Sequence, residues 1–293
     1  MKKRIFALLV CTLILLLLST ASAQTVTDVM GRTVEVSSAQ RIVSLTPSNT
    51  EILFALGLGD RVVGVDAYSN YPPEAAAIEA KCGDYSGPNT ELIVSLKPDL
   101  VLAGNKLQTE TVSTLEALGL TVLATEADAY DEIASSIRLI ADAAGADAVP
   151  LIDEMAEKEQ RILAAIADKA PVSVYYAVSF GDWGDYTVGP GSFIYDLLEK
   201  IGTKPITFDS PVPWPMYSLE EIVSKNPEVI LLAADEARAA EFFVQPGYKD
   251  LPAVLVGRVY TIDTDMASRP APRVLDAMAQ MAEVVYGITI PRE

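Results

Sequence analysis

Short apolar runs rich in β-branched residues alternate with stretches of helical spacing along most of the chain. In the first half, the strand-like runs are residues 41–45, 61–65, 99–103 and 121–124. The helix-like stretches among and after them are residues 48–56, 89–96, 109–118 and 130–144. Regular alternation of strand and helix is typical of parallel sheets built from βα units. Ahead of these units, residues 26–36 alternate around Met30-Gly31-Arg32 and predict a short hairpin.

One long helix-like stretch divides this pattern near the middle of the chain. Residues 148–169 carry Ile152, Met155, Ile162 and Ile166 near helical spacing, with charged residues between them. A proline follows the stretch and ends it. The spacing predicts a single long helix whose charged positions face solvent.

Beyond this helix the alternation resumes. The strand-like runs there are residues 172–178, 228–233 and 259–262, and the helix-like stretches are residues 192–201, 218–226 and 272–285. The pattern predicts an α/β protein of two lobes with parallel-type sheets, joined by one long helix. We expect an N-terminal lobe at 24–144, a linking helix at 145–171 and a C-terminal lobe at 172–293.

A segment of fifteen residues recurs on the two sides of the central helix. Residues 89–103 match residues 218–232, with six identical positions. In each copy a polar residue precedes a short helix with a carboxylate in its first turn, and a proline ends the helix before a buried strand. Two copies, one per half, indicate two lobes of related construction rather than a solenoid, which needs several short repeats.

The first 23 residues have the pattern of a secretory signal peptide. Lys2, Lys3 and Arg4 precede an uncharged run at 5–18, and Ala21-Ser22-Ala23 follows. The uncharged run has 14 residues, fewer than the roughly 20 that a membrane-spanning helix needs. We therefore predict cleavage after residue 23, and a mature protein located in a periplasm or at a cell surface.

Charge and histidine content exclude several classes of function. Removal of the three basic residues of the leader takes the formal charge from −18 to −21, which disfavours nucleic acid as a partner. The chain contains no histidine, which excludes Ser-His-Asp and Cys-His catalysis and His-ligated zinc or haem. Only Cys82 remains after cleavage, and we interpret it as a packed side chain rather than a nucleophile. We predict no catalytic residue, no metal site and no resident cofactor.

Two patterns predict helix caps. Ser48 with Glu51, and Ser218 with Glu221, have the spacing of a capping box, in which a hydroxyl and a carboxylate satisfy each other's backbone amides. We assign these four residues a structural role only.

Glu91 and Glu220 occupy equivalent positions of the repeat. Under one interpretation each carboxylate only complements the dipole of its own helix. Under the other, the two carboxylates dock onto basic residues of a partner, one from each lobe. The spacing alone leaves both interpretations open.

Large aromatic residues gather in segments that follow strands or precede helices. They are Tyr68, Tyr71, Tyr85, Phe180, Trp183, Tyr186, Trp214 and Tyr217. Ligands of open α/β sheets bind at such loops, and Tyr and Trp side chains suit a large, flat or partly apolar ligand. Local packing under the loops is an equal alternative. Arg269 and Arg273 near Asp265 suit a carboxylate or phosphate group, or a solvated loop.

Residues 41–51, Arg-Ile-Val-Ser-Leu-Thr-Pro-Ser-Asn-Thr-Glu, and residues 96–101, Leu-Lys-Pro-Asp-Leu-Val, resemble the periplasmic binding proteins of siderophore, haem and cobalamin ABC importers. The resemblance covers nearly all of the mature chain. It implies two Rossmann-like lobes bridged by a rigid helix, with the ligand held in the cleft between them. It also implies that Glu91 and Glu220 pair with arginines of a permease dimer.

Within this family the loops around Tyr68, Phe180 and Trp214 are most similar to those of cobalamin binders. The resemblance implies that the ligand contacts include Tyr68, Tyr85, Tyr186, Trp214, Asp265 and Arg269. The clustering of aromatic residues in loops adds Phe180 and Trp183 as candidate ligand contacts. Tyr85 stands where a Trp is expected, and Tyr186 where a Phe is expected. The hairpin at 28–32 is more familiar from siderophore and haem binders.

The combined expectation is a monomeric binding protein without catalysis that captures cobalamin or a related corrinoid and presents it to an ABC importer. A ferric siderophore is the alternative ligand. Haem ranks lower, because without histidine its iron would need Tyr or Met ligation. A secreted two-lobed enzyme is the remote alternative, since it would need an acid and base pair in the cleft.

Overall fold

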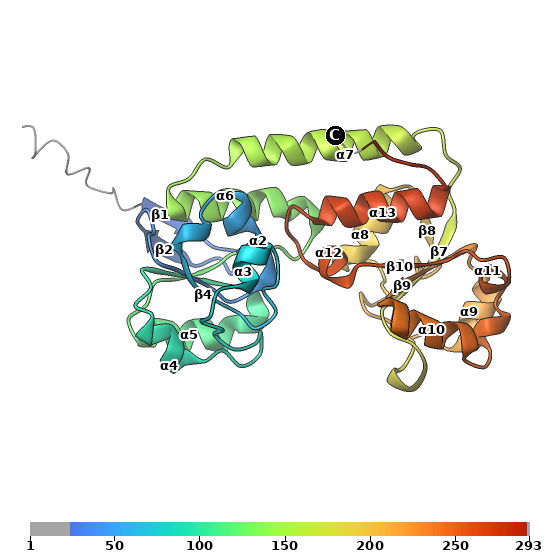
Figure 1. Cartoon of the computed structure of the whole chain (residues 1–293), viewed down its shortest axis with the longest axis horizontal. Helices are drawn as coiled ribbons and strands as arrows, with labels where there is room; N and C mark the ends of the chain where they lie inside the picture. Colours follow the sequence, from blue (N-terminus) through green and yellow to red (C-terminus); the bar gives the residue numbers. More distant parts are fainter. Residues whose placement is uncertain (1–23, 292–293) are drawn as a thin grey trace, which may run out of the picture.

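The computed structural model describes residues 24–291. The predicted signal peptide, residues 1–23, lies outside the described residues. We call residues 24–144 the N-lobe and residues 172–291 the C-lobe. Figure 1 shows the two lobes side by side, with one long helix running along both of them.

Each lobe contains a four-stranded, fully parallel sheet. The N-lobe sheet has the order β4-β3-β5-β6, formed by β3 Ile42–Ser44, β4 Val62–Val65, β5 Leu100–Ala103 and β6 Val122–Ala124. The C-lobe sheet has the order β8-β7-β9-β10, formed by β7 Ser173–Ala177, β8 Lys204–Pro205, β9 Val229–Ala233 and β10 Val259–Ile262. Numbered within its own lobe, each sheet has the order 2-1-3-4. The prediction of two α/β lobes with parallel sheets is confirmed.

Helices cover both faces of the sheets. In the N-lobe they are α2 Pro47–Ala55, α3 Pro73–Ala76, α4 Thr90–Ser95, α5 Thr109–Ala117 and α6 Ile133–Ala144, with the 3-10 turns η1 Gly59–Arg61, η2 Lys106–Gln108 and η3 Tyr130–Glu132. In the C-lobe they are α8 Phe193–Lys200, α9 Leu219–Lys225, α10 Glu236–Val244, α11 Pro252–Leu255, α12 Thr264–Ser268 and α13 Val274–Tyr286, with η4 Gly181–Trp183 and η5 Tyr248–Asp250. The sequence pattern did not predict β8, α3, α10, α11 or α12.

The predicted hairpin forms at the start of the described chain. The strands β1 Gln24–Thr27 and β2 Thr33–Val36 pair antiparallel. Asp28 closes the turn, because its side chain accepts from the backbone amides of Met30 and Arg32 at 3.0 and 2.9 Å. The backbone amide of Val29 donates to the carbonyl of Ala124 at 3.1 Å, which fixes the hairpin against β6.

The long central helix is α7 Val149–Ile166, within the predicted 148–169. Ile162 and Ile166 are buried against the core, while Lys158 pairs with Asp276 of α13 at 2.6 Å. The helix therefore contacts the C-lobe along its second half. The buried isoleucines keep α7 packed on α13, because separation of the two helices would expose these side chains to water.

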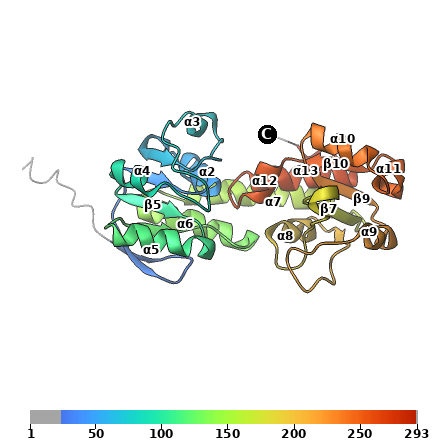
Figure 2. The same ribbon diagram turned by 90° about the horizontal axis from the view of Figure 1, so that it is seen from below.

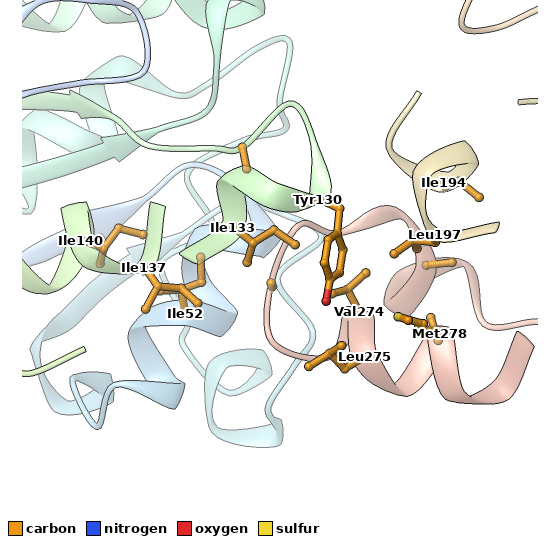
Figure 3. Close-up of a cluster of buried hydrophobic side chains, with 14 of the residues drawn as sticks. Ile52, Tyr130, Ile133, Ile137, Ile140, Ile194, Leu197, Val274, Leu275 and Met278 are labelled. Atoms are coloured by element: carbon orange, nitrogen blue, oxygen red, sulfur yellow. The ribbon is translucent and has the colours of Figure 1, made fainter. Parts of the chain in front are cut away.

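The hydrophobic core is continuous between the lobes. Tyr130 of η3 extends from the N-lobe into a cluster formed by Val274 and Met278 of α13 and Leu197 of α8, as Figure 3 shows. Lys200 of α8 lies 4.7 Å from the centroid of the Tyr130 ring and pairs with Glu159 of α7 at 2.9 Å. The lobes are thus joined by packed side chains as well as by the linking helix.

The internal repeat forms the same elements in both lobes. Asn89 caps α4 by accepting from the amide of Leu92, and Ser218 caps α9 by accepting from the amide of Glu221. Lys97 and Asn226, at the same position of the repeat, follow these helices with φ of 50° and 47°. In residues 24–291 they are the only non-glycine residues with positive φ. Each helix then leads into the third strand of its sheet.

Candidate functional site

The segments that follow the carboxyl ends of β4 and β10 meet at the junction of the lobes. The loop after β4 carries Tyr68 and Asn70, and α12 after β10 carries Asp265 and ends at Arg269. The side-chain amide of Asn70 donates to Asp265 at 2.7 Å, and Arg269 donates to the Asn70 oxygen at 2.8 Å. Loops at the carboxyl ends of parallel strands are where open α/β sheets bind ligands. This junction is therefore the candidate site.

A buried ion pair fixes the junction. Arg269 and Arg273 of the C-lobe both donate to the carboxylate of Glu51 in α2, at 2.9 Å and at 2.6 and 2.9 Å. The side chains of Glu51 and Arg269 are only 2% and 8% exposed. The Arg273 guanidinium also stacks on Tyr71, 3.7 Å from the ring centroid. Loss of either partner would leave a buried charge unpaired, which is costly, so this ion pair stabilises the packing of the N-lobe against the C-lobe.

Glu51 does not take part in the capping box that the sequence predicted. The N-cap of α2 is Thr46, whose hydroxyl accepts from the amide of Asn49. Pro47 occupies the first helical position, where its fixed φ and missing amide are tolerated, and this sets the cap two residues before Ser48. Glu51 is thereby free to reach the C-lobe. The second predicted box, Ser218 with Glu221, does form.

The structure brings Asp265 and Arg269 together, as the sequence suggested. Arg269 pairs with Asp265 at 2.8 Å, but its other contacts are Glu51, Asn70 and the carbonyl of Tyr68. Its guanidinium is committed to the junction, whereas the Asp265 carboxylate is about half exposed. Direct contact of either residue with a ligand stays a prediction.

Three of the predicted aromatic residues are unusually exposed. Tyr68 is 64% exposed, Trp214 50% and Tyr186 45%. Tyr186 and Trp214 lie on two segments that pair with each other, through a bridge between Tyr186 and Met216 and a hydrogen bond from the Thr187 amide to the Pro215 carbonyl at 3.0 Å. Both segments leave the carboxyl ends of C-lobe strands. Large apolar side chains left in solvent at strand ends are typical of a binding surface.

Phe180 does not lie on that surface, which corrects the prediction. It is 2% exposed, and its ring packs 5.0 Å from Phe242 and 6.2 Å from Tyr248 between ring centroids. The guanidinium of Arg238 covers the ring at 4.1 Å. Phe180 is therefore part of the C-lobe core. The side chain of Trp183, the neighbouring prediction, lies outside the described side chains.

Tyr85 belongs to a polar group at the carboxyl edge of the N-lobe sheet. Its hydroxyl lies 2.9 Å from the side-chain oxygen of Asn105 and 3.3 Å from Glu126, and its one proton can be donated to either acceptor. Ser48 donates to Glu126 at 2.5 Å. A Cβ atom on Gly104 would lie 2.9 Å from the Tyr85 hydroxyl, so a larger residue there would displace the tyrosine side chain. Sequence reasoning missed Glu126, although a carboxylate placed directly after a buried strand was the available signal.

Burial perturbs two carboxyl groups near the junction. Burial raises the pKa of Glu126, although its hydrogen bond from Ser48 acts in the opposite direction. Burial also raises the pKa of Asp66, which is 2% exposed and accepts from Ser69 and from the amide of Tyr68. A carboxyl group carries no positive charge, whether neutral or ionised, so Glu126 and Asp66 add no electrostatic attraction for an anionic ligand. The two arginines of the junction are already paired with Glu51.

Other predicted features have clear places in the structure. Glu91 on α4 and Glu220 on α9 are exposed. Cys82 is fully buried, and burial together with the charge of Asp66 raises the pKa of its thiol to about 11. Residues 24–291 hold no group of three potential metal ligands. None of their helices is long and apolar enough to cross a membrane.

The fold and this junction define a binding protein of two lobes, and comparison with known proteins identifies the family. Residues 42–266 match the periplasmic binding protein family, and the chain belongs to it. The chain is 36% identical over 258 residues to an uncharacterized ABC transporter substrate-binding lipoprotein of Bacillus subtilis, covering 84% of this chain and 80% of the relative. The protein is thus a substrate-binding protein of the ABC transporter kind.

Two further relatives have named ligands. A vitamin B12-binding protein of Vibrio cholerae is 32% identical over 248 residues, covering 83% of this chain and 88% of the relative. A cobalamin-binding protein of Halobacterium salinarum is 35% identical over 273 residues, covering 87% and 71%. The relatives described here are named as binding or transport proteins, which confirms the expectation of a protein without catalysis.

Solved structures confirm the expected architecture. The periplasmic vitamin B12-binding protein of Vibrio cholerae has a TM-score of 0.74 and 30% identity, covering 85% of this chain and 97% of that structure. A possible iron-binding periplasmic solute-binding protein of Staphylococcus epidermidis has a TM-score of 0.74 and 29% identity, covering 85% and 100%.

Proposed function

We propose that this protein captures cobalamin or a related corrinoid between its lobes and delivers it to the permease of an ABC importer. The observation that carries the proposal is the exposure of Tyr68, Tyr186 and Trp214 on loops at the carboxyl ends of strands. A corrin ring is large, flat and partly apolar, and aromatic side chains suit such a surface. The names of the relatives from Vibrio cholerae and Halobacterium salinarum support the same ligand.

The charges at the junction favour a ligand without strong negative charge. Arg269 and Arg273 are held by Glu51, and Arg269 is further paired with Asp265. An anionic ligand would have to break a buried ion pair to gain an arginine, at a cost of several kcal/mol. Corrin side chains are mainly neutral amides, which Asp265, Asn70 and Tyr85 can meet with hydrogen bonds.

A ferric siderophore is the second candidate ligand. The structural similarity to the possible iron-binding protein of Staphylococcus epidermidis favours it. Haem is the third, since the exposed Tyr68, Tyr186 and Met216 offer the side-chain types that could ligate its iron in a chain without histidine.

Delivery to the importer would use Glu91 and Glu220. Both carboxylates are exposed on short helices at equivalent positions of the two lobes. We propose that each pairs with arginines of the permease dimer, that residues 1–23 direct export, and that the protein acts as a monomer in a periplasm or at a cell surface.

Calorimetric titration tests the ligand. Cyanocobalamin is titrated into the processed protein, residues 24–293, with tryptophan fluorescence recorded in parallel, and with ferric siderophores and haemin as comparisons. We expect saturation at one ligand per protein with a dissociation constant at or below about 1 μM, near −8 kcal/mol. Saturation by a siderophore or haemin, without cobalamin binding, would overturn the corrinoid assignment and keep the transport role.

A further inference from the structure

Three of the six identities between the repeat copies have a packing explanation. These are Ile93 with Ile222, Pro98 with Pro227, and Leu102 with Leu231, and all six residues are buried. Each lobe uses the isoleucine to pack its short helix on the sheet and the leucine to fill the third strand. The same helix and the same strand occupy equivalent places in the two lobes, and this accounts for the three buried identities.

The other three identities are exposed and have no such explanation. They are Glu91 with Glu220, Val94 with Val223, and Ser95 with Ser224. Residues spaced by three and four positions share one face of a helix, so each lobe presents the same glutamate, valine and serine together. Val94 is 39% exposed and Val223 is 50% exposed. One exposed valine is ordinary, but the same valine beside the same glutamate in both lobes indicates a shared role.

The two faces are arranged about an approximate two-fold axis. Both sheets have the order 2-1-3-4, and α4 and α9 each precede the third strand. In Figure 1 both helices lie on the side of the molecule away from α7. In Figure 2 they lie at opposite ends and on opposite sides of the long axis, as a two-fold axis along the line of view requires.

We infer that Val94 and Val223 form the apolar part of one bipartite docking surface for the permease dimer of the importer, beside the proposed ion pairs of Glu91 and Glu220. Each half of that two-fold symmetric partner would offer a basic group for the glutamate and, beside it, a small apolar pocket for the valine. The inference rests on the proposed transport function. It adds the apolar contact and the equivalence of the two halves.

The glutamate and the valine would contribute differently to docking. Exposed charges mainly guide association and fix orientation, and salt weakens them. A valine that enters a pocket loses its exposed apolar surface, which favours the bound state and is not screened by salt. Because the two halves belong to one rigid molecule, engagement of one raises the effective concentration of the other. Loss of either valine should therefore weaken the whole complex by a similar factor.

The test compares valine variants of the processed, exported protein. Val94→Ser, Val223→Ser and the double variant are measured for binding to the importer reconstituted in lipid nanodiscs, and for stimulation of its ATP hydrolysis. We expect each single change to weaken binding about fivefold and the double change about twentyfold. Cyanocobalamin affinity and urea unfolding should be unchanged. Val149→Ser is the matched control, since Val149 is 59% exposed at the start of α7, on the other side of the molecule.

Three outcomes would overturn the inference. If the double valine variant binds as the wild type while Glu91→Ala with Glu220→Ala loses binding, the apolar contact is wrong and the proposed transport role stands. If only one valine matters, the equivalence of the two halves is wrong. If neither the valine nor the glutamate double variant changes importer binding, both this inference and the proposed docking through Glu91 and Glu220 are wrong.

Discussion

Arg269 of the C-lobe donates to Glu51 of the N-lobe at 2.9 Å, in a site where both side chains are almost fully buried. The two residues are 218 positions apart in the chain. Their contact lies where the loops after β4 and β10 meet, which is also where the candidate ligand site lies. The orientation of the lobes and the charge of the site are therefore set by the same carboxylate.

Glu51→Gln should destabilise the protein strongly. The change leaves Arg269 buried without its ion-pair partner and leaves Arg273 with a weaker one. We expect the free energy of unfolding to fall by about 3–5 kcal/mol, measured by urea denaturation. Glu35→Gln on the exposed face of β2 is the control and should lie within about 0.5 kcal/mol of the wild type. Equal stability of the two variants would contradict the structural role of Glu51.

Trp214→Ala and Phe180→Ala should separate binding from packing. Trp214 is half exposed at a strand end, so its removal should weaken cyanocobalamin binding at least about tenfold, with little change in stability. Phe180 is a core residue, so its removal should cost about 3–5 kcal/mol of stability, while the folded fraction keeps its ligand affinity. Calorimetric titration and urea denaturation measure the two effects. A Trp214→Ala protein that binds like the wild type would remove the aromatic surface from the proposal.

Glu126→Gln should change how stability depends on pH. The folded protein raises the pKa of Glu126 above the ordinary value of 4.5, so the folded state binds the proton more tightly than the unfolded state. As the pH falls from 7 towards 4.5, the wild type should gain free energy of unfolding relative to the variant, which cannot titrate there. Urea denaturation of both proteins across this range gives the difference. A difference that is constant with pH, or of opposite sign, would show that the carboxyl is not perturbed by burial.

The sequence predicted the parts of the fold that depend on local periodicity. Isoleucines at helical spacing located α7, and short apolar runs located every strand of the two parallel sheets except β8. It missed β8, because two residues are too short to form a pattern. It also missed α3 of the N-lobe and α10, α11 and α12 of the C-lobe, whose packing is set by neighbours distant in sequence.

The candidate site was predicted less completely, because its contacts are long-range. Arg269 and Asp265 were correctly associated, since they are one helical turn apart, but the pairing of Arg269 with Glu51 joins opposite ends of the chain. Phe180 could not be distinguished from its exposed neighbours by type. Its burial depends on Phe242 and Tyr248, which approach it only after the C-lobe has folded.

The continuous core around Tyr130 has a consequence for how the protein denatures. The same apolar cluster contains Ile52 and Ile137 of the N-lobe and Leu198 and Met278 of the C-lobe, so neither sheet can melt without exposing the side chains of the other. Heating should therefore produce a single calorimetric transition with equal van't Hoff and calorimetric enthalpies. Although the molecule carries two sheets of the same topology, we expect it to unfold as one cooperative unit, and a fragment of either half would expose the face that its counterpart covers.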